Sequence, residues 1–199
     1  MLRVGLTGGI GTGKSTVLQM LLERGASTVD ADAIARSVSA RGGAAIPAIA
    51  QHFGSDFIAA DGGLDRVRMR ERAYRDPQAR QQLEAIIHPL VGREIALRVD
   101  TVRSAGSACV VLDIPLLVES GRWRSQLDQV LVVDCSPETQ IARVTARSGL
   151  KPGEVEAIIA AQASRQFRLA AADQVICNEG LPLEQLRAEV AQVAGTFGL

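Results

Sequence analysis

Residues 8–15 read Gly8-Gly9-Ile10-Gly11-Thr12-Gly13-Lys14-Ser15 and match the pattern G-x-x-x-x-G-K-[ST] at every fixed position. A polyphosphate must be surrounded by several backbone N–H groups at once, and glycines let the chain curl that closely around it. Lys14 supplies a charge for the outer phosphates, and the Ser15 hydroxyl is placed to bind Mg²⁺. The stretch therefore predicts a P-loop with ATP and Mg²⁺ as its ligands.

The residues on both sides of this loop predict a strand before it and a helix after it. Leu2–Thr7 alternates apolar and small residues like a short buried strand, and Lys14–Arg24 places apolar residues at helical spacing before Gly25. A helix N-terminus at this point adds partial positive charge to the site. A glycine-rich turn without a ligand is the alternative, and this strand, loop and helix context argues against it.

Composition excludes several classes of protein. The chain has 199 residues, 47% of them hydrophobic and 3% aromatic, which indicates an aliphatic α/β core. Its 22 basic and 22 acidic residues give no net charge, which argues against a nucleic-acid-binding surface. No apolar run approaches the length of a membrane span and no leader precedes the first strand, so we expect a cytoplasmic protein without a membrane partner. The three cysteines include no C-x-x-C pair, so we expect them to be small core residues of a protein in a reducing compartment.

The strand pattern predicts a P-loop fold of the three-layer α/β/α kind with a five-stranded parallel sheet. Four more strands are expected at Ser27–Asp30, Cys109–Asp113, Gln129–Asp134 and Gln174–Cys177. Residues 1–40 and 104–199 would form the core. Residues 41–103, in which helices are expected at 44–53, 64–74 and 77–102, would form a helical insertion that binds the acceptor. Pro89 should bend or split the last of these helices.

Four aspartates lie at the ends of predicted strands, where an open α/β sheet binds its ligands. Asp30 and Asp32 follow the second strand, and either could be a general base or merely cap the next helix. Asp113 and Asp134 end two apolar strands. Asp32, Asp113 and Asp134 all stay open as the acid that organises Mg²⁺.

The last third of the core predicts a lid at about residues 143–168. Ser136 should cap a helix that carries Arg143 and Arg147 one turn apart, and residues 149–153 break the pattern. A second helix is expected to contain Gln162, Arg165 and Arg168. Arginines on such a lid can neutralise a transferring phosphoryl group, although a solvated basic face is the alternative for at least half of them.

A small-molecule kinase fits these features better than a GTPase switch or a motor. The sequence lacks N-K-x-D and D-x-x-G, which a GTPase needs, and it lacks the basic surface or extra length of a motor. The residues alone therefore indicate a P-loop kinase of the nucleoside-monophosphate-kinase type with an unknown acceptor.

Six blocks of the sequence resemble the dephospho-CoA kinase family in order and spacing. They are Leu6–Thr16, Val29–Asp32, Asp61–Arg66, Leu83–Pro89, Pro115–Glu119 and Ala172–Asn178. The P-loop block is shared by many kinases, whereas D-A-D, L-E-x-I-I-H-P and P-L-L-x-E are more particular to this family. Thr12 stands where the family more usually has Ser, which matters little because the loop binds through its backbone.

The resemblance implies ATP-dependent phosphorylation of the ribose 3′-hydroxyl of dephospho-CoA, the final step of coenzyme A biosynthesis, by a monomer or weak homo-oligomer. It implies catalytic roles for Asp32 as general base and for Lys14 and Arg143 in stabilising the transferred group. The residues that it implies at the nucleotide are Gly9, Ile10, Gly11, Thr12, Gly13, Lys14, Ser15, Thr16, Arg147 and Asn178. Thr7, Arg66 and His88 are expected to bind substrate, with Thr7 beside the nucleotide site, although a histidine next to a proline is more often structural. A nucleoside monophosphate kinase or another small-molecule kinase stays the alternative.

Overall fold

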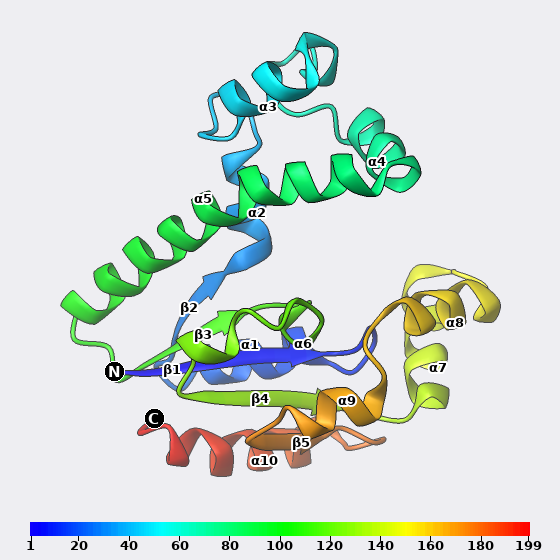
Figure 1. Cartoon of the computed structure of the whole chain (residues 1–199). Coiled ribbons are helices and arrows are strands. Elements are labelled where there is room, and N and C mark those ends of the chain that lie inside the picture. The colour runs from blue at the N-terminus through cyan, green and yellow to red at the C-terminus, as the bar shows by residue number, and fades with distance from the viewer. The chain divides into compact units, whose positions relative to one another are not determined.

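The computed structural model describes residues 1–199 and contains one sheet of five strands (Figure 1). The strands are β1 (Leu2–Gly8), β2 (Ser27–Asp30), β3 (Cys109–Asp113), β4 (Gln129–Asp134) and β5 (Gln174–Cys177). They lie in the order β2-β3-β1-β4-β5, in which β1 pairs in parallel with β3 and β4, and β4 pairs in parallel with β5. The predicted five-stranded parallel sheet of an α/β fold is confirmed.

Ten α-helices and two short 3₁₀ helices accompany the sheet. The α-helices are α1 (Lys14–Leu22), α2 (Ala31–Val38), α3 (Ile46–Phe53), α4 (Arg66–Arg75), α5 (Pro77–Ser104), α6 (Leu117–Ser120), α7 (Pro137–Ser148), α8 (Pro152–Ala161), α9 (Arg165–Ala170) and α10 (Leu183–Thr196), and the 3₁₀ helices span Ser55–Phe57 and Arg124–Gln126. None of these helices combines the length and the apolar composition that crossing a membrane requires.

The chain forms two compact units, each with its own core. The P-loop unit comprises Met1–Val29 and Thr101–Leu199, and the helical unit comprises Asp30–Asp100. The acceptor-binding role expected for residues 41–103 stays a prediction.

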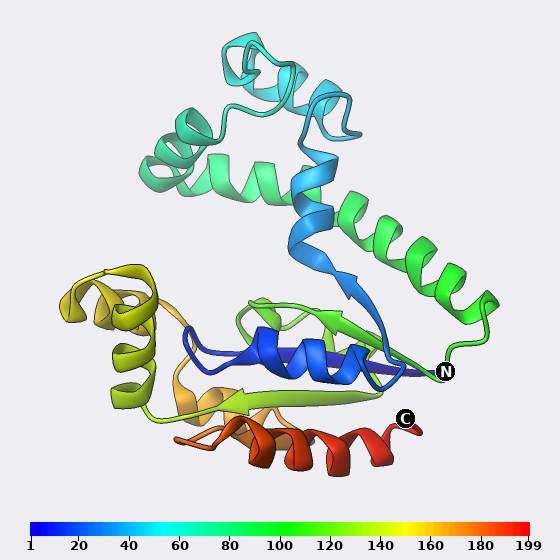
Figure 2. The ribbon, with the colours of Figure 1, turned by 180° about the vertical axis from the view of Figure 1, so that it is seen from behind.

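Helices α1 and α10 cover one face of the sheet in the P-loop unit (Figure 2). Alternate side chains of the central strands, such as Val4 and Leu6 of β1, point into this layer and are completely buried. They pack against Leu21 of α1 and Val190 of α10. Burial of each such aliphatic side chain contributes about 1.5–3 kcal/mol, so the strand that leads into the P-loop is held firmly.

The helical unit closes around a smaller apolar cluster. Ile49 of α3 and Met69 of α4 are buried there, and Leu83 and Ile87 of α5 pack against them. Helix α5 continues through Pro89 as one helix of 28 residues, and Figure 1 shows that it changes direction near its middle. The helix therefore bends without being split, which is one of the two outcomes expected of Pro89.

One expectation about local structure is wrong, and one open alternative is decided. Gln162, Arg165 and Arg168 do not share one helix: α8 ends at Ala161 with Gln162 as its cap, and Ser164 caps α9 by accepting a hydrogen bond from the Phe167 amide at 3.2 Å. Asp32, one of the two possible caps of the helix after β2, lies inside the first turn of α2, because α2 begins at Ala31 and Asp30 is its cap, accepting a hydrogen bond from the Ala33 amide at 2.8 Å. In both places a short polar side chain satisfies an otherwise unpaired amide of the first helical turn.

Candidate active site

The P-loop joins β1 to α1 in a conformation that depends on its glycines. Gly13 caps α1 with φ +93° and Gly11 has φ +76°, a region that side-chain-bearing residues rarely adopt. A Cβ added to Gly13 would also lie 2.4 Å from Nδ2 of Asn178. The Thr12 hydroxyl donates to the Gly9 carbonyl at 2.9 Å and closes the loop on itself. Thr12 is thus a structural residue of the loop, and its hydroxyl is buried.

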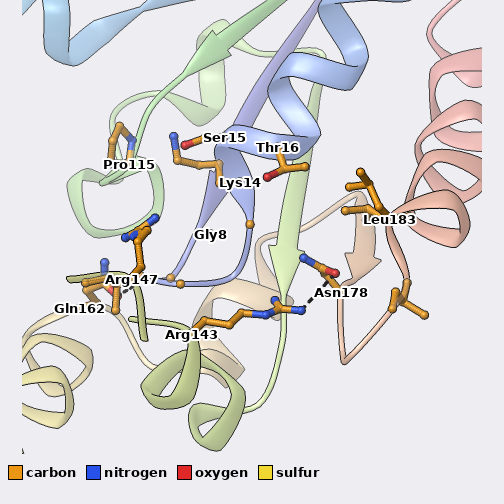
Figure 3. A pocket seen from close by; sticks show the side chains of 16 residues that line it. Gly8, Lys14, Ser15, Thr16, Pro115, Arg143, Arg147, Gln162, Asn178 and Leu183 are labelled. Atoms are coloured by element: carbon orange, nitrogen blue, oxygen red, sulfur yellow. Dashed lines mark hydrogen bonds between the residues drawn. The ribbon is translucent and has the colours of Figure 1, made fainter. Parts of the chain in front are cut away.

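A cavity of about 480 Å³ opens beside this loop within the P-loop unit (Figure 3). Its lining comes from the loop, α1, the turn after β3, α7, the end of α8, the segment after β5 and α10. The lining residues are Gly8, Gly9, Ile10, Gly11, Gly13, Lys14, Ser15, Thr16, Pro115, Arg143, Arg147, Gln162, Asn178, Leu181, Leu183 and Leu186. Three of these side chains are cationic and none is acidic, so the cavity suits a polyanion.

Asn178 connects the end of β5 to both the P-loop and the lid. Its Nδ2 donates to the Thr12 carbonyl at 2.8 Å, and its Oδ1 accepts from Nη2 of Arg143 at 3.4 Å (Figure 3). Arg143 also donates to the same carbonyl at 3.5 Å. Arg143 and Asn178, which were each predicted at the site, therefore lie together at the cavity, and Arg147 lies there with them.

Glu179 is a residue of this region that the sequence did not reveal. Its carboxylate accepts hydrogen bonds from the Ser136 amide at 2.5 Å, from the Ser136 hydroxyl at 3.0 Å and from the Thr139 hydroxyl. These bonds, with Thr139 contributing most, lower the pKa of Glu179 below its ordinary value. They connect the loop after β5 to the start of α7 and so keep Asn178 next to Arg143.

Two acids, at the ends of the strands on either side of β1, have different partners. Asp113, at the end of β3, forms an ion pair with Lys14 of the P-loop. Asp134, at the end of β4, accepts three hydrogen bonds from Arg165: Nε donates to Oδ1 at 3.1 Å and to Oδ2 at 2.9 Å, and Nη2 donates to Oδ2 at 2.7 Å. That contact raises the pKa of Arg165 above its ordinary value. Asp134 is therefore neutralised by a guanidinium, whereas Asp113 lies against the phosphate-binding lysine.

Three other residues singled out in the sequence, Thr7, Arg165 and Arg168, lie outside the lining of the cavity. Thr7 is fully buried, lies outside the cavity lining, and donates its hydroxyl to the Pro115 carbonyl at 3.1 Å. Arg165 and Arg168 also lie outside the cavity lining, unlike the arginines of α7. The leucines after β5, by contrast, were not expected at the site; an isolated Leu-Pro-Leu stretch offers no sequence signal that distinguishes a ligand contact from core packing.

The helical unit has a pocket of its own, of about 430 Å³. One part of its lining is apolar and the other carries charge. The lining residues are Asp32, Ala35, Arg36, Ser39, Leu64, Arg66, Met69, Arg70, Ala73, Leu83 and Ile87. Arg66 donates to the Ser39 hydroxyl at 3.0 Å and to the Arg36 carbonyl at 3.3 Å, which orients its guanidinium. The predicted residues Asp32 and Arg66 thus share one pocket, and His88 lies outside its lining.

Comparisons with known proteins agree with one another. A model of the family described as "Dephospho-CoA kinase" matches residues 2–183. Dephospho-CoA kinase from Albidiferax ferrireducens is 57% identical over 199 residues, which cover 100% of this chain and 94% of the relative. The enzyme of that name from Burkholderia pseudomallei is 54% identical and covers 96% of this chain and 93% of the relative.

A solved structure has a similar fold. A crystal structure of a Thermus thermophilus protein is 32% identical, with a TM-score of 0.82, and covers 100% of this chain and 97% of its own. The match of the family model over most of the chain, together with relatives more than half identical along nearly their whole length, shows that the chain belongs to the dephospho-CoA kinase family.

Proposed function

We propose that this protein transfers the γ-phosphoryl group of ATP to the ribose 3′-hydroxyl of dephospho-CoA and so forms coenzyme A. The observation that carries the proposal is the acid-free cavity at the P-loop, lined by Lys14, Arg143 and Arg147, in a chain that belongs to this family. A cytoplasmic enzyme that acts as a monomer or weak homo-oligomer is part of the proposal. Three cysteines without a disulfide support a reducing compartment.

The residues of the cavity fit a nucleoside triphosphate. The loop leaves no room for larger residues, because a Cβ on Gly8 would lie 2.6 Å from the backbone oxygen of Val133. Amides of residues 9–16 would hold the phosphates together with Lys14, and Arg147 and Asn178 would complete the nucleotide site. Leu181 and Leu183 offer apolar surface on which a base can lie.

The same cavity offers few protein ligands for Mg²⁺. The structure has no cluster of three His, Cys, Asp or Glu side chains that could hold a metal, which suits an ion that is bound mainly by phosphates and water. The Ser15 hydroxyl would be a ligand, and we propose Asp113 as the acid that organises the ion, because its partner Lys14 lines the cavity, whereas Asp134 is paired with Arg165, which lies outside the lining. When bound, Mg²⁺ would neutralise charge on the outer phosphates.

The pocket of the helical unit fits an acceptor with a pyrophosphate and an apolar arm. Arg36, Arg66 and Arg70 would bind the phosphates, because guanidinium groups pair with phosphate through two hydrogen bonds. Met69 and Ile87 would line the path of the arm. His88 stays a predicted substrate contact without further support from this pocket.

Asp32 is the proposed general base. It lines the pocket assigned to the acceptor and would take the proton of the 3′-hydroxyl as that oxygen attacks the γ-phosphorus and the bond to ADP breaks. Lys14 and Arg143 would stabilise the charge that develops on the transferred group.

The experiment that tests this function follows ADP formation from Mg-ATP with dephospho-CoA, AMP, CMP, shikimate or water. We expect turnover with dephospho-CoA alone and a product one phosphoryl group heavier by mass spectrometry. Turnover on a nucleoside monophosphate instead would favour another P-loop kinase activity. ATP hydrolysis with water alone would overturn the kinase assignment.

A further inference from the structure

Arg168 of α9 is a buried cation without an acidic partner. It is 4% exposed, it donates to the Ala163 carbonyl through Nη1, and its Nε has no hydrogen-bond partner. No carboxylate forms an ion pair with it, whereas Arg165, in the same helix, is about half exposed and paired with Asp134. Because a buried charge without a counter-charge destabilises a fold, an anion that binds nearby would offset that cost.

The guanidinium of Arg168 packs against the P-loop at Gly9. A Cβ on Gly9 would lie 2.9 Å from Nη2 of Arg168 and 2.4 Å from Nε2 of Gln140, so only a glycine allows this approach. Gly9 lines the cavity and Arg168 does not. The cation therefore lies behind the loop, separated from the cavity by the backbone of Gly9.

The next residue of the loop is held by side chains on both of its backbone groups. Gln140 of α7, which is 2% exposed, donates from Nε2 to the Ile10 carbonyl at 2.6 Å. The Ile10 amide donates to Oε1 of Gln162 at 3.0 Å. Residues 9 and 10 are thus contacted by three side chains: Gln140 of α7, Gln162 at the end of α8 and Arg168 of α9.

We propose that Arg168 is a positioning residue of the polyphosphate site, which raises the affinity for phosphates by its charge without touching them. Its guanidinium acts through Gly9 across a short, water-poor path, where electrostatic interactions are stronger than in solvent. The packing against Gly9 and Gln140 keeps the loop close to this charge. The inference rests on the proposed function only in requiring that the cavity bind a polyphosphate, and it is independent of the acceptor.

Calorimetric titration of the whole protein with two probes, inorganic tripolyphosphate with Mg²⁺ and adenosine, tests this role. In Arg168→Met we expect the affinity for tripolyphosphate to fall at least about tenfold. This is the effect of removing one attraction between two unit charges about 10 Å apart at an effective dielectric constant of about 20. The affinity for adenosine, which carries no phosphate, should stay unchanged. Arg168→Lys retains the charge and should bind tripolyphosphate within about threefold of the native protein.

Arg187→Met is the matched control, because Arg187 is about half exposed and paired with Glu23. It should change neither affinity. A folded Arg168→Met protein that binds tripolyphosphate like the native one would overturn the proposal, and so would an Arg168→Lys protein as weak as Arg168→Met. If Arg168→Met does not fold, the test depends on Arg168→Lys. A fall of tenfold or more in its affinity for tripolyphosphate would show that the charge at residue 168 is not what raises the affinity. Native protein that bound no tripolyphosphate would overturn the proposed function as well.

Discussion

Lys14 of the P-loop and Asp113 at the end of β3 form an ion pair whose two side chains are 16% and 15% exposed. The pair crosses from one strand to the next, since Leu6 of β1 lies opposite Asp113 in the parallel register. Bound phosphates would compete with this carboxylate for the lysine. The relationship therefore distinguishes Asp113 from the other acids at the strand ends.

Asp113→Asn should lower kcat by about 10²–10³, the usual cost of removing one electrostatic group from an active site. The Mg²⁺ concentration for half-maximal rate should rise, while the affinity for metal-free ATP stays the same or increases because Lys14 is released. Steady-state assays over a Mg²⁺ series measure kcat and the Mg²⁺ concentration for half-maximal rate. Asp128→Asn is the control, because Asp128 is an exposed acid that contacts Arg3. An unchanged Mg²⁺ dependence in Asp113→Asn would contradict the assignment.

Asp134→Asn should act on stability instead of on metal dependence. The Asp134 side chain is 5% exposed and its partner Arg165 is 47% exposed. The free energy of unfolding should therefore fall by about 1–3 kcal/mol, which is less than the ~3–5 kcal/mol that breaking a fully buried pair costs. Urea unfolding measures this change. Glu23→Gln, which breaks an exposed pair with Arg187, should cost less than about 1 kcal/mol. A shifted Mg²⁺ dependence in Asp134→Asn would show that the wrong acid has been assigned.

Asp32→Asn should depress turnover by about 10²–10⁴, the usual worth of a positioned general base, and leave ATP binding nearly intact. The neighbouring Asp30 supplies the control, because it caps α2 and asparagine is an equally good cap. Asp30→Asn should therefore retain both turnover and stability. Single-turnover rates together with nucleotide titration separate chemistry from binding. Near-normal turnover in Asp32→Asn would leave Asp32 with no part in the chemistry.

Arg70→Ala should raise the KM for dephospho-CoA by about tenfold or more, because charge-assisted hydrogen bonds to phosphate are worth about 1.5–3 kcal/mol. The KM for ATP should not change. Arg75→Ala removes a guanidinium from the same helix outside the pocket lining and is the matched control. Equal effects of the two substitutions would point to the general charge of α4 instead of a specific contact.

The cysteines should differ in reactivity. Burial raises the pKa of the Cys109 and Cys135 thiols to about 11, from 9.0, whereas Cys177 is exposed. At pH 8 we expect iodoacetamide to label Cys177 alone in the folded protein, as peptide mass mapping can show. Fast labelling of either buried thiol would contradict this environment.

The same shift predicts how stability changes at alkaline pH. A thiol whose pKa is raised by folding contributes stability that is fully present below pH 9 and is lost as the pH rises from 9 towards 11. The free energy of unfolding from urea titrations should therefore fall over this range. Cys135→Ala should show a smaller fall than the native protein, and an equal fall would assign the effect to other groups.

Local patterns in the sequence were enough to predict the P-loop, the five strands and the cap of α7. The glycines, the buried aliphatic runs and Ser136 act through interactions within a few residues, and the structure has each of these elements where the pattern indicates it. The same patterns also limited the candidate acids of the active site to a few aspartates, because polar side chains at strand ends face the ligand edge of such a sheet.

Partners far apart in the sequence were decided only by the tertiary structure. Asp113 and Asp134 end similar apolar strands, yet one meets Lys14 and the other meets Arg165, and no local rule specifies which contact a strand end receives. Arg168 looked like a lid residue but is buried behind Gly9, because the break at Ser164 starts a new helix that packs against the loop. Sequence determined the elements and their chemistry through short-range interactions. Packing of the elements determined which charges meet, since Lys14 and Asp113 are 99 positions apart in the sequence and Asp134 and Arg165 are 31 apart.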